Sequence, residues 1–167
     1  MGFSECDGVR IMKELIESIN EIVKYGLESN ISELEKVQNL EKNLIIFYKL
    51  YFEFEDKFDE TEYSEFDSSK FLNIEENIKS NFPTIGFYNT FIDLTKVPTT
   101  ESNCALGDAF YDLLDIIKAI LEIKWRLENN SYDNGIWFFK FIFKNHTKQH
   151  ILGLLNYLNE SESQQLI

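Results

Sequence analysis

Side chains that can exchange protons or bind a metal recur at helical spacing near the end of the chain. His146 and His150 are the only histidines among the 167 residues and are four positions apart. Asp108, Asp112 and Asp115 are spaced by four and then three. Residues at these intervals share one face of an α-helix. Imidazole and carboxylate groups form charge-assisted hydrogen bonds and ligate transition metals. We call these five residues the Asp/His cluster.

Two helices must position this cluster, and the sequence predicts that they form a hairpin over residues 102–158. Apolar residues recur at helical spacing on both sides of Asn129 and Asn130, which favour a turn. Helices joined by so short a turn pack antiparallel. Both rise about 1.5 Å per residue, so residues whose numbers sum to roughly 260 lie at the same height. We therefore expect the aspartates to face the two histidines.

Three interpretations of the Asp/His cluster compete. In the favoured one, the aspartates accept hydrogen bonds from histidine or lysine and fix the register of the helices. In the second, they face solvent and pair loosely with Lys118, Lys144 and Lys148. In the third, facing helices hold a metal ion, although the Glu-x-x-His pairs of di-iron bundles and the glutamate of a metalloprotease helix are missing. The favoured interpretation predicts a structural cluster without a metal or cofactor.

A second polar feature is the acidic segment, residues 53–67, which has the strongest charge bias in the chain. Lys57 is its only base, and aromatic residues are interspersed with the acids. Repulsion between carboxylates disfavours regular packing, so we expect a loop that its rings hold in place. The alternative is a merely solvated loop. The candidate partner-binding residues are Glu53, Glu55, Asp56, Asp59, Glu60, Glu62 and Glu65.

Composition limits the possible partners. The chain has 29 acidic and 16 basic residues and a formal net charge of −13. This charge repels phosphate groups, so we expect a basic protein as partner and neither nucleic acid nor a membrane. No apolar run approaches the roughly 18 residues of a membrane span, and no signal peptide is recognisable. Cys6 and Cys104 have no metal-ligand or redox spacing. We therefore expect a soluble, cytoplasmic protein with reduced thiols.

The remaining periodicity predicts an all-α fold. A chain of this length favours a single domain, here residues 1–167. We expect a bundle of about five helices that ends in the hairpin, and residues 85–94 fit either a short helix or an extended stretch. The expected helices cover about 8–27, 32–52, 68–82, 102–128 and 131–158.

The surroundings of the Asp/His cluster resemble a known family. The runs 107–116 and 137–150, together with Gly86-Phe87-Tyr88-Asn89, resemble the bacterial domain-of-unknown-function family numbered 5063 over roughly residues 82–158. That family places an aspartate-bearing helix before a helix with a His-Trp-x-x-His run, and Thr147 stands here in place of its tryptophan. The family has no assigned activity. The resemblance implies an all-helical bacterial protein in which the Asp/His cluster is a unit.

The functional hypothesis rests on what the chain contains and lacks. It has no Gly-rich phosphate loop and no nucleophile elbow. We therefore expect a non-enzymatic protein-binding module, most plausibly an immunity or antitoxin-type inhibitor that masks a basic toxin or effector. The alternative is a metal-binding bundle, or a metal-dependent enzyme, that uses Asp112, Asp115, His146 and His150. A third is a scaffold subunit that dimerises through its aromatic-rich helices.

Overall fold

Helices make up most of the fold, and two short strands project from one end of it. The structure, a computed structural model, describes residues 5–32, 34–55, 57–58, 61–93, 95 and 104–165. The predicted predominance of helix is confirmed, whereas the two-stranded sheet is not anticipated by the sequence pattern. No described helix is long and apolar enough to span a membrane. In chain order the elements are α1 (Glu5–Leu27), α2 (Lys36–Leu50), the 3₁₀ turn η1 (Ser68–Lys70), α3 (Ile74–Asn81), β1 (Phe87–Phe91), β2 (Cys104–Asp108), α4 (Ala109–Asn129), α5 (Tyr132–Ile142), the π-helical turn η3 (Phe143–Thr147) and α6 (Lys148–Gln165).

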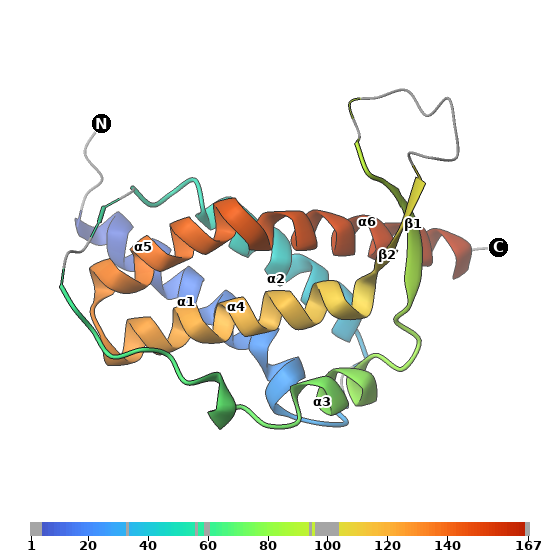
Figure 1. Cartoon of the computed structure of the whole chain (residues 1–167), viewed down its shortest axis with the longest axis horizontal. Coiled ribbons are helices and arrows are strands. Elements are labelled where there is room, and N and C mark those ends of the chain that lie inside the picture. Colours follow the sequence, from blue (N-terminus) through green and yellow to red (C-terminus); the bar gives the residue numbers. More distant parts are fainter. Residues whose placement is uncertain are drawn as a thin grey trace.

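Three consecutive helical elements, α5, η3 and α6, return along α4 after a short turn. The Ser131 hydroxyl caps α5 by accepting a hydrogen bond from the Asn134 N–H at 3.0 Å. α4 contacts both α5 and α6, and Figure 1 shows the orange and red helices lying along the yellow-orange α4. This arrangement brings the aspartates of α4 next to the histidines of η3 and α6.

The core lies between these helices and the α1–α2 pair. α1 contacts α2, α3 and α4, and α2 contacts α6. Burial of apolar side chains between the helices is the dominant favourable contribution to such a fold. The side chains with no exposed surface include Leu15, Ile22, Leu44, Phe47, Leu113, Ile117, Phe139 and Phe143.

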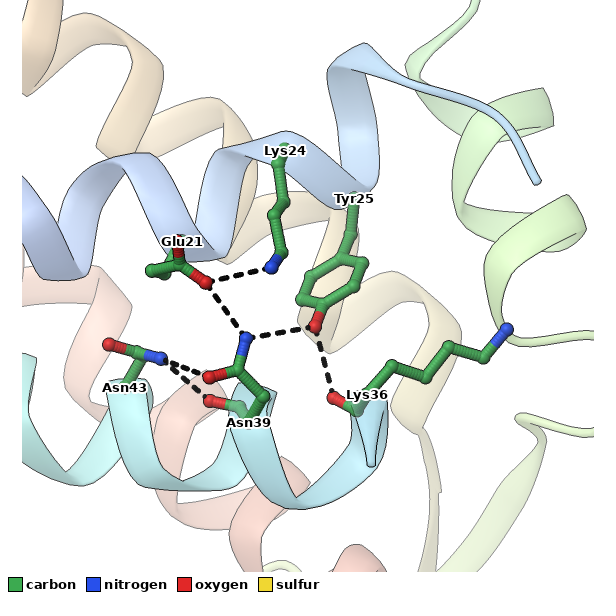
Figure 2. A network of polar contacts seen from close by, with 6 residues as sticks. All are labelled: Glu21, Lys24, Tyr25, Lys36, Asn39 and Asn43. Atoms are coloured by element: carbon green, nitrogen blue, oxygen red, sulfur yellow. Dashed lines mark hydrogen bonds and ion pairs between the residues drawn. The ribbon is translucent and has the colours of Figure 1, made fainter. Parts of the chain in front are cut away.

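A polar network joins α1 to α2 (Figure 2). Asn39 Nδ2 donates hydrogen bonds to Glu21 Oε2 at 2.8 Å and to the Tyr25 hydroxyl at 3.3 Å. The Tyr25 hydroxyl in turn donates to the Lys36 carbonyl at 3.2 Å, and Lys24 Nζ lies 2.7 Å from Glu21 Oε2. Because Tyr25 is fully buried and buried polar groups must keep partners, this network fixes how α1 sits on α2.

The sheet corrects the predicted start of the fourth helix. Residues 104–108 form a strand rather than the first turns of a helix, and they pair antiparallel with β1 from Phe87↔Asp108 to Phe91↔Cys104. This register also settles residues 87–91 as extended. α4 begins only at Ala109, because Asp108 has an extended backbone and its carboxylate caps the helix. A helical period in the sequence does not reveal this strand, because its partner lies elsewhere in the chain.

Candidate functional sites

Asp112 is the centre of a hydrogen-bonded chain that spans three elements. Its Oδ1 lies 2.8 Å from His150 Nδ1 on α6, and its Oδ2 accepts a hydrogen bond from the Tyr88 hydroxyl on β1 at 2.7 Å. The Asp112 side chain is only 13% exposed. A carboxylate this well covered needs such donors, because a buried charge without partners is costly. The hydrogen-bonded series Tyr88–Asp112–His150 therefore connects the sheet to α4 and α6.

Two glycines make room for the Tyr88 ring. A Cβ at Gly107, on β2, would overlap the ring itself, and a Cβ at Gly153, on α6, would overlap its hydroxyl oxygen. Gly153 lies inside a helix, where glycine costs roughly 1 kcal/mol relative to alanine. The absence of side chains at these two positions lets the Tyr88 hydroxyl reach Asp112.

Hydrogen bonding to Asp112 contributes to raised pKa values in both of its partners. Hydrogen bonding to Asp112 raises the pKa of His150 above its ordinary value of 6.5, and the Asp112 and Asp115 charges add to this, while burial acts in the opposite direction. The pKa of the Tyr88 hydroxyl is raised, chiefly by burial and then by its hydrogen bond to Asp112. Tyr88 therefore remains a proton donor to Asp112.

Asp115 and His146 lie beside His150, which is the last member of the hydrogen-bonded series Tyr88–Asp112–His150. The ligand atoms of Asp115, His146 and His150 are all within 4.8 Å of one another. His150 Nε2 is 3.8 Å from Asp115 Oδ2, which is too long for a hydrogen bond. The two imidazole rings are 4.5 Å apart between centroids. Four of the five members of the Asp/His cluster thus come together.

Asp108, the fifth member, lies apart from the other four because it precedes the helix. Its Oδ1 accepts hydrogen bonds from the backbone N–H groups of Phe110 at 3.0 Å and Tyr111 at 3.3 Å. The helical spacing that groups Asp108 with Asp112 and Asp115 does not apply, because residue 108 is the last residue of β2. Its role in the structure is to cap α4.

His146 lies within the π-helical turn η3, Phe143–Thr147. π-helical turns are rare in proteins, but those that occur are often found at functional sites. Thr147 is fully buried, and its Oγ1 has no hydrogen-bond partner in the described part of the chain. A buried hydroxyl without a partner is unfavourable. The helix therefore carries an energetic cost next to the two histidines.

A pocket of about 560 Å³ opens beside these residues. Its polar lining includes Asp115 and His146 together with Ser68, Lys118 and Glu122, and its apolar lining includes Phe66, Phe71 and Ile74. Of the three lysines considered as loose partners, Lys118 lines the same pocket. None of these lysines forms an ion pair with Asp112 or Asp115 among the described residues.

The acidic segment leaves the core at a buried lysine. Lys140 on α5 is only 9% exposed, and its Nζ donates to the carbonyls of Tyr51 at 2.8 Å and Phe54 at 2.9 Å. The same ammonium lies 4.1 Å from the centroid of the Tyr51 ring. Lys140 therefore holds the chain just beyond α2, where the acidic segment begins.

An exposed ring cluster, Phe58, Trp137 and Phe141, lies where the acidic segment crosses α5. Phe58 packs edge-on against Trp137 with centroids 5.4 Å apart, and Trp137 stacks on Phe141 at 5.6 Å. Phe58 is nevertheless 64% exposed and Phe141 49% exposed. Lys57, next to Phe58, forms an ion pair with Asp133. Apolar rings of α5 and of the acidic segment therefore remain at the surface where the two meet.

The structure describes four of the seven candidate partner-binding residues. Glu55, Glu62 and Glu65 are exposed and Glu53 is half-buried. Within the described ranges, none of these four carboxylates has a hydrogen-bond or ion-pair partner. The described residues between 55 and 67 form neither helix nor strand, as the charge repulsion predicts. The other three candidates, Asp56, Asp59 and Glu60, lie outside the described residues.

The sequence pattern does not single out Tyr88, Gly107 and Gly153 as a unit. Tyr88 belongs to a segment whose conformation the sequence leaves open, and its contact with Asp112 depends on the sheet. One available signal is a glycine in the interior of a strongly helical segment, such as Gly153, since such a glycine often has a packing reason.

Comparisons of the chain with family models, with curated proteins and with solved structures find no match. The resemblance to family 5063 stays a prediction, and the sites are interpreted from their own geometry.

Proposed function

We propose that the chain is a non-enzymatic protein-binding module, an immunity or antitoxin-type inhibitor that masks a basic protein. The observation that carries this proposal is the exposed ring cluster beside carboxylates without partners. Phe58 is 64% exposed, and the carboxylates of Glu55, Glu62 and Glu65 are exposed within the same segment. Exposed aromatic rings and unpaired charged side chains are both typical of protein-binding surfaces.

The two kinds of side chain would contribute differently to binding. Desolvation of aromatic rings supplies much of the binding energy at such interfaces. The carboxylates act mainly on the rate of encounter and on the choice of partner, because a partner with many lysines and arginines is attracted by the net charge of −13. This contribution falls as salt is added, since the screening length is only about 8 Å at physiological ionic strength.

We further propose a bacterial, cytoplasmic setting. The resemblance of residues 82–158 to family 5063 supports the bacterial setting. The cytoplasmic setting is supported by Cys6 and Cys104, which lack the spacing of a disulfide framework or a metal site. Cys104 is an exposed free cysteine.

The test is co-expression with the product of the neighbouring gene, followed by co-purification and a growth assay. A neighbour that is toxic alone and harmless in a stable complex supports the proposal. Phe58→Ala should weaken the complex, and the double variant Glu62→Lys/Glu65→Lys should slow association. The matched control is Glu76→Lys/Glu160→Lys, which changes the net charge equally at exposed positions elsewhere. A neighbour that is harmless alone and forms no complex would contradict the proposal, as would a complex that both double variants weaken to the same extent.

A further inference from the structure

Three metal-binding side chains converge where α4 meets η3 and α6. Asp115 Oδ2 and His150 Nε2 are 3.8 Å apart, and a ligand atom of His146 lies within 4.8 Å of both. Two zinc ligands at bond lengths of about 2.0–2.2 Å are roughly 3.4 Å apart in a tetrahedral site. Metal binding would require the half-exposed Asp115 and the exposed His146 to rotate until the three atoms reach that spacing.

Asp112 orients His150 as a ligand. It occupies Nδ1 of the imidazole at 2.8 Å. When Nδ1 carries the proton in the neutral ring, the lone pair is on Nε2, the nitrogen that faces Asp115. Metal-bound histidines almost always donate their second ring nitrogen to a carboxylate or carbonyl in this way. Tyr88 fixes the other oxygen of Asp112 and so holds the carboxylate in place.

The charges at this point favour a dication. Asp112 and Asp115 place two carboxylates around one imidazole ring, against the single ammonium of Lys118 in the adjoining pocket, in a chain whose net charge is −13. Two imidazoles and one carboxylate are also a ligand set that suits divalent transition metals better than calcium or magnesium, which prefer oxygen ligands throughout.

The pocket supplies the remaining coordination space. Asp115 and His146 both line it, so a metal held between them would face its interior. Three protein ligands and one open position are the arrangement of metal sites that bind water or a small ligand. His146 lies in the π-helical turn η3, and π-helical turns often occur at functional sites.

We propose that Asp115, His146 and His150 bind one divalent transition-metal ion, of which zinc is the best fit, with Asp112 as the carboxylate that orients His150. This site shares no residue with the exposed ring cluster, and the inference does not depend on the proposed inhibitor function.

The test uses the full-length chain without a purification tag, cleared of metal with a chelator. Titration with zinc chloride is followed by calorimetry, and titration with cobalt chloride by visible absorption, which is intense for four-coordinate cobalt. We expect one equivalent of each ion and a higher melting temperature. His146→Ala and Asp115→Asn should each weaken binding at least about tenfold, which is the lower end of the loss caused by removing even an outer-sphere partner.

Two controls make the result specific. Glu128→Gln removes an exposed carboxylate from the same helix, about 20 Å along the axis from Asp115, and should leave zinc affinity unchanged. His146 and His150 are the only histidines, so zinc should shift both sets of imidazole resonances in NMR spectra. Circular dichroism checks that each variant is folded. If His146→Ala does not fold, Asp115→Asn, which keeps the side-chain shape, still tests the site.

The proposal is overturned if neither ion binds in a saturable way. It is also overturned if Glu128→Gln weakens binding as much as the two site variants do, because that result indicates diffuse attraction to an acidic surface. Binding of a basic partner by folded His146→Ala protein distinguishes failure of this site from failure of the proposed inhibitor function.

Discussion

Asp112 and His150 meet at 2.8 Å across the interface between α4 and α6. The contact joins residues 38 positions apart in sequence, and the Tyr88 hydroxyl occupies the second oxygen of the same carboxylate. The two helices and the sheet therefore share one polar anchor. Its consequences for stability can be measured separately from any question of function.

Removal of this anchor is expected to destabilise the fold in a non-additive way. Asp112→Asn should cost about 1–3 kcal/mol, because it removes a charged acceptor from a largely buried hydrogen bond. Tyr88→Phe should cost about 0.5–1.5 kcal/mol. Since both variants act on one carboxylate, the double variant should lose less than the sum, with a coupling no larger than the Tyr88→Phe loss itself, about 0.5–1.5 kcal/mol. Urea denaturation of the four proteins measures the coupling, and strictly additive losses would show that the two bonds are independent.

The positions of Asp112 and His150 show how far helical spacing can predict a site. α4, α5 and α6 share the α-helical rise per residue, so counting outward from the turn places Asp112, Asp115, His146 and His150 at roughly one height, although a five-residue π-helical turn joins α5 to α6. Asp108 is misplaced by the same reasoning, since the helix starts one residue later and residues 104–108 pair with β1. Strands of five residues are too short for a period of two to stand out, and their pairing joins separate segments, so the contact of Tyr88 with Asp112 is not predicted.

The acidic segment illustrates the opposite case. Its lack of regular structure follows from composition alone, because neighbouring carboxylates repel one another. The anchor that holds its start is not evident from composition. In the sequence, Lys140 is one charged residue among the aromatic residues of α5. Only the packing shows that its ammonium is buried against two backbone carbonyls.

Replacement of Lys140 is expected to loosen the start of the acidic segment. Lys140→Met keeps most of the side-chain volume but leaves the carbonyls of Tyr51 and Phe54 without their donor, which should cost about 1–3 kcal/mol. Hydrogen exchange should become faster in the residues just after α2. Lys144→Met, four residues later at an exposed position, is the matched control and should change neither. Equal effects of the two substitutions would contradict an anchoring role for Lys140.

Gly153→Ala is expected to destabilise the fold although alanine favours helix. The added Cβ would overlap the Tyr88 hydroxyl oxygen, so the ring must shift and its bond to Asp112 must lengthen, at a typical cost of about 1–3 kcal/mol. Gly8→Ala in α1 is the matched control, because a Cβ there meets nothing within 4 Å. It should be neutral, or stabilising by up to about 1 kcal/mol. Thermal melts compare the two, and a stabilised Gly153→Ala protein would show that the ring has room to move.

The Glu21 network predicts a loss of stability in acid (Figure 2). Hydrogen bonds first from Lys24 and then from Asn39 hold the pKa of Glu21 below its ordinary value of 4.5. Since the folded-state pKa is the lower one, the unfolded chain takes up the proton more readily. The contribution of Glu21 is therefore present above pH 4.5 and is lost as the pH falls through the folded-state pKa. Glu21→Gln should lower the urea midpoint at neutral pH, and its difference from the wild type should shrink at about pH 3. Glu17→Gln, which removes an exposed carboxylate of α1 that lies 3.6 Å from Lys13, is the control and should change the midpoint little at either pH. A Glu21→Gln difference that stays constant between the two pH values would mean that the carboxylate charge does not stabilise the α1–α2 contact.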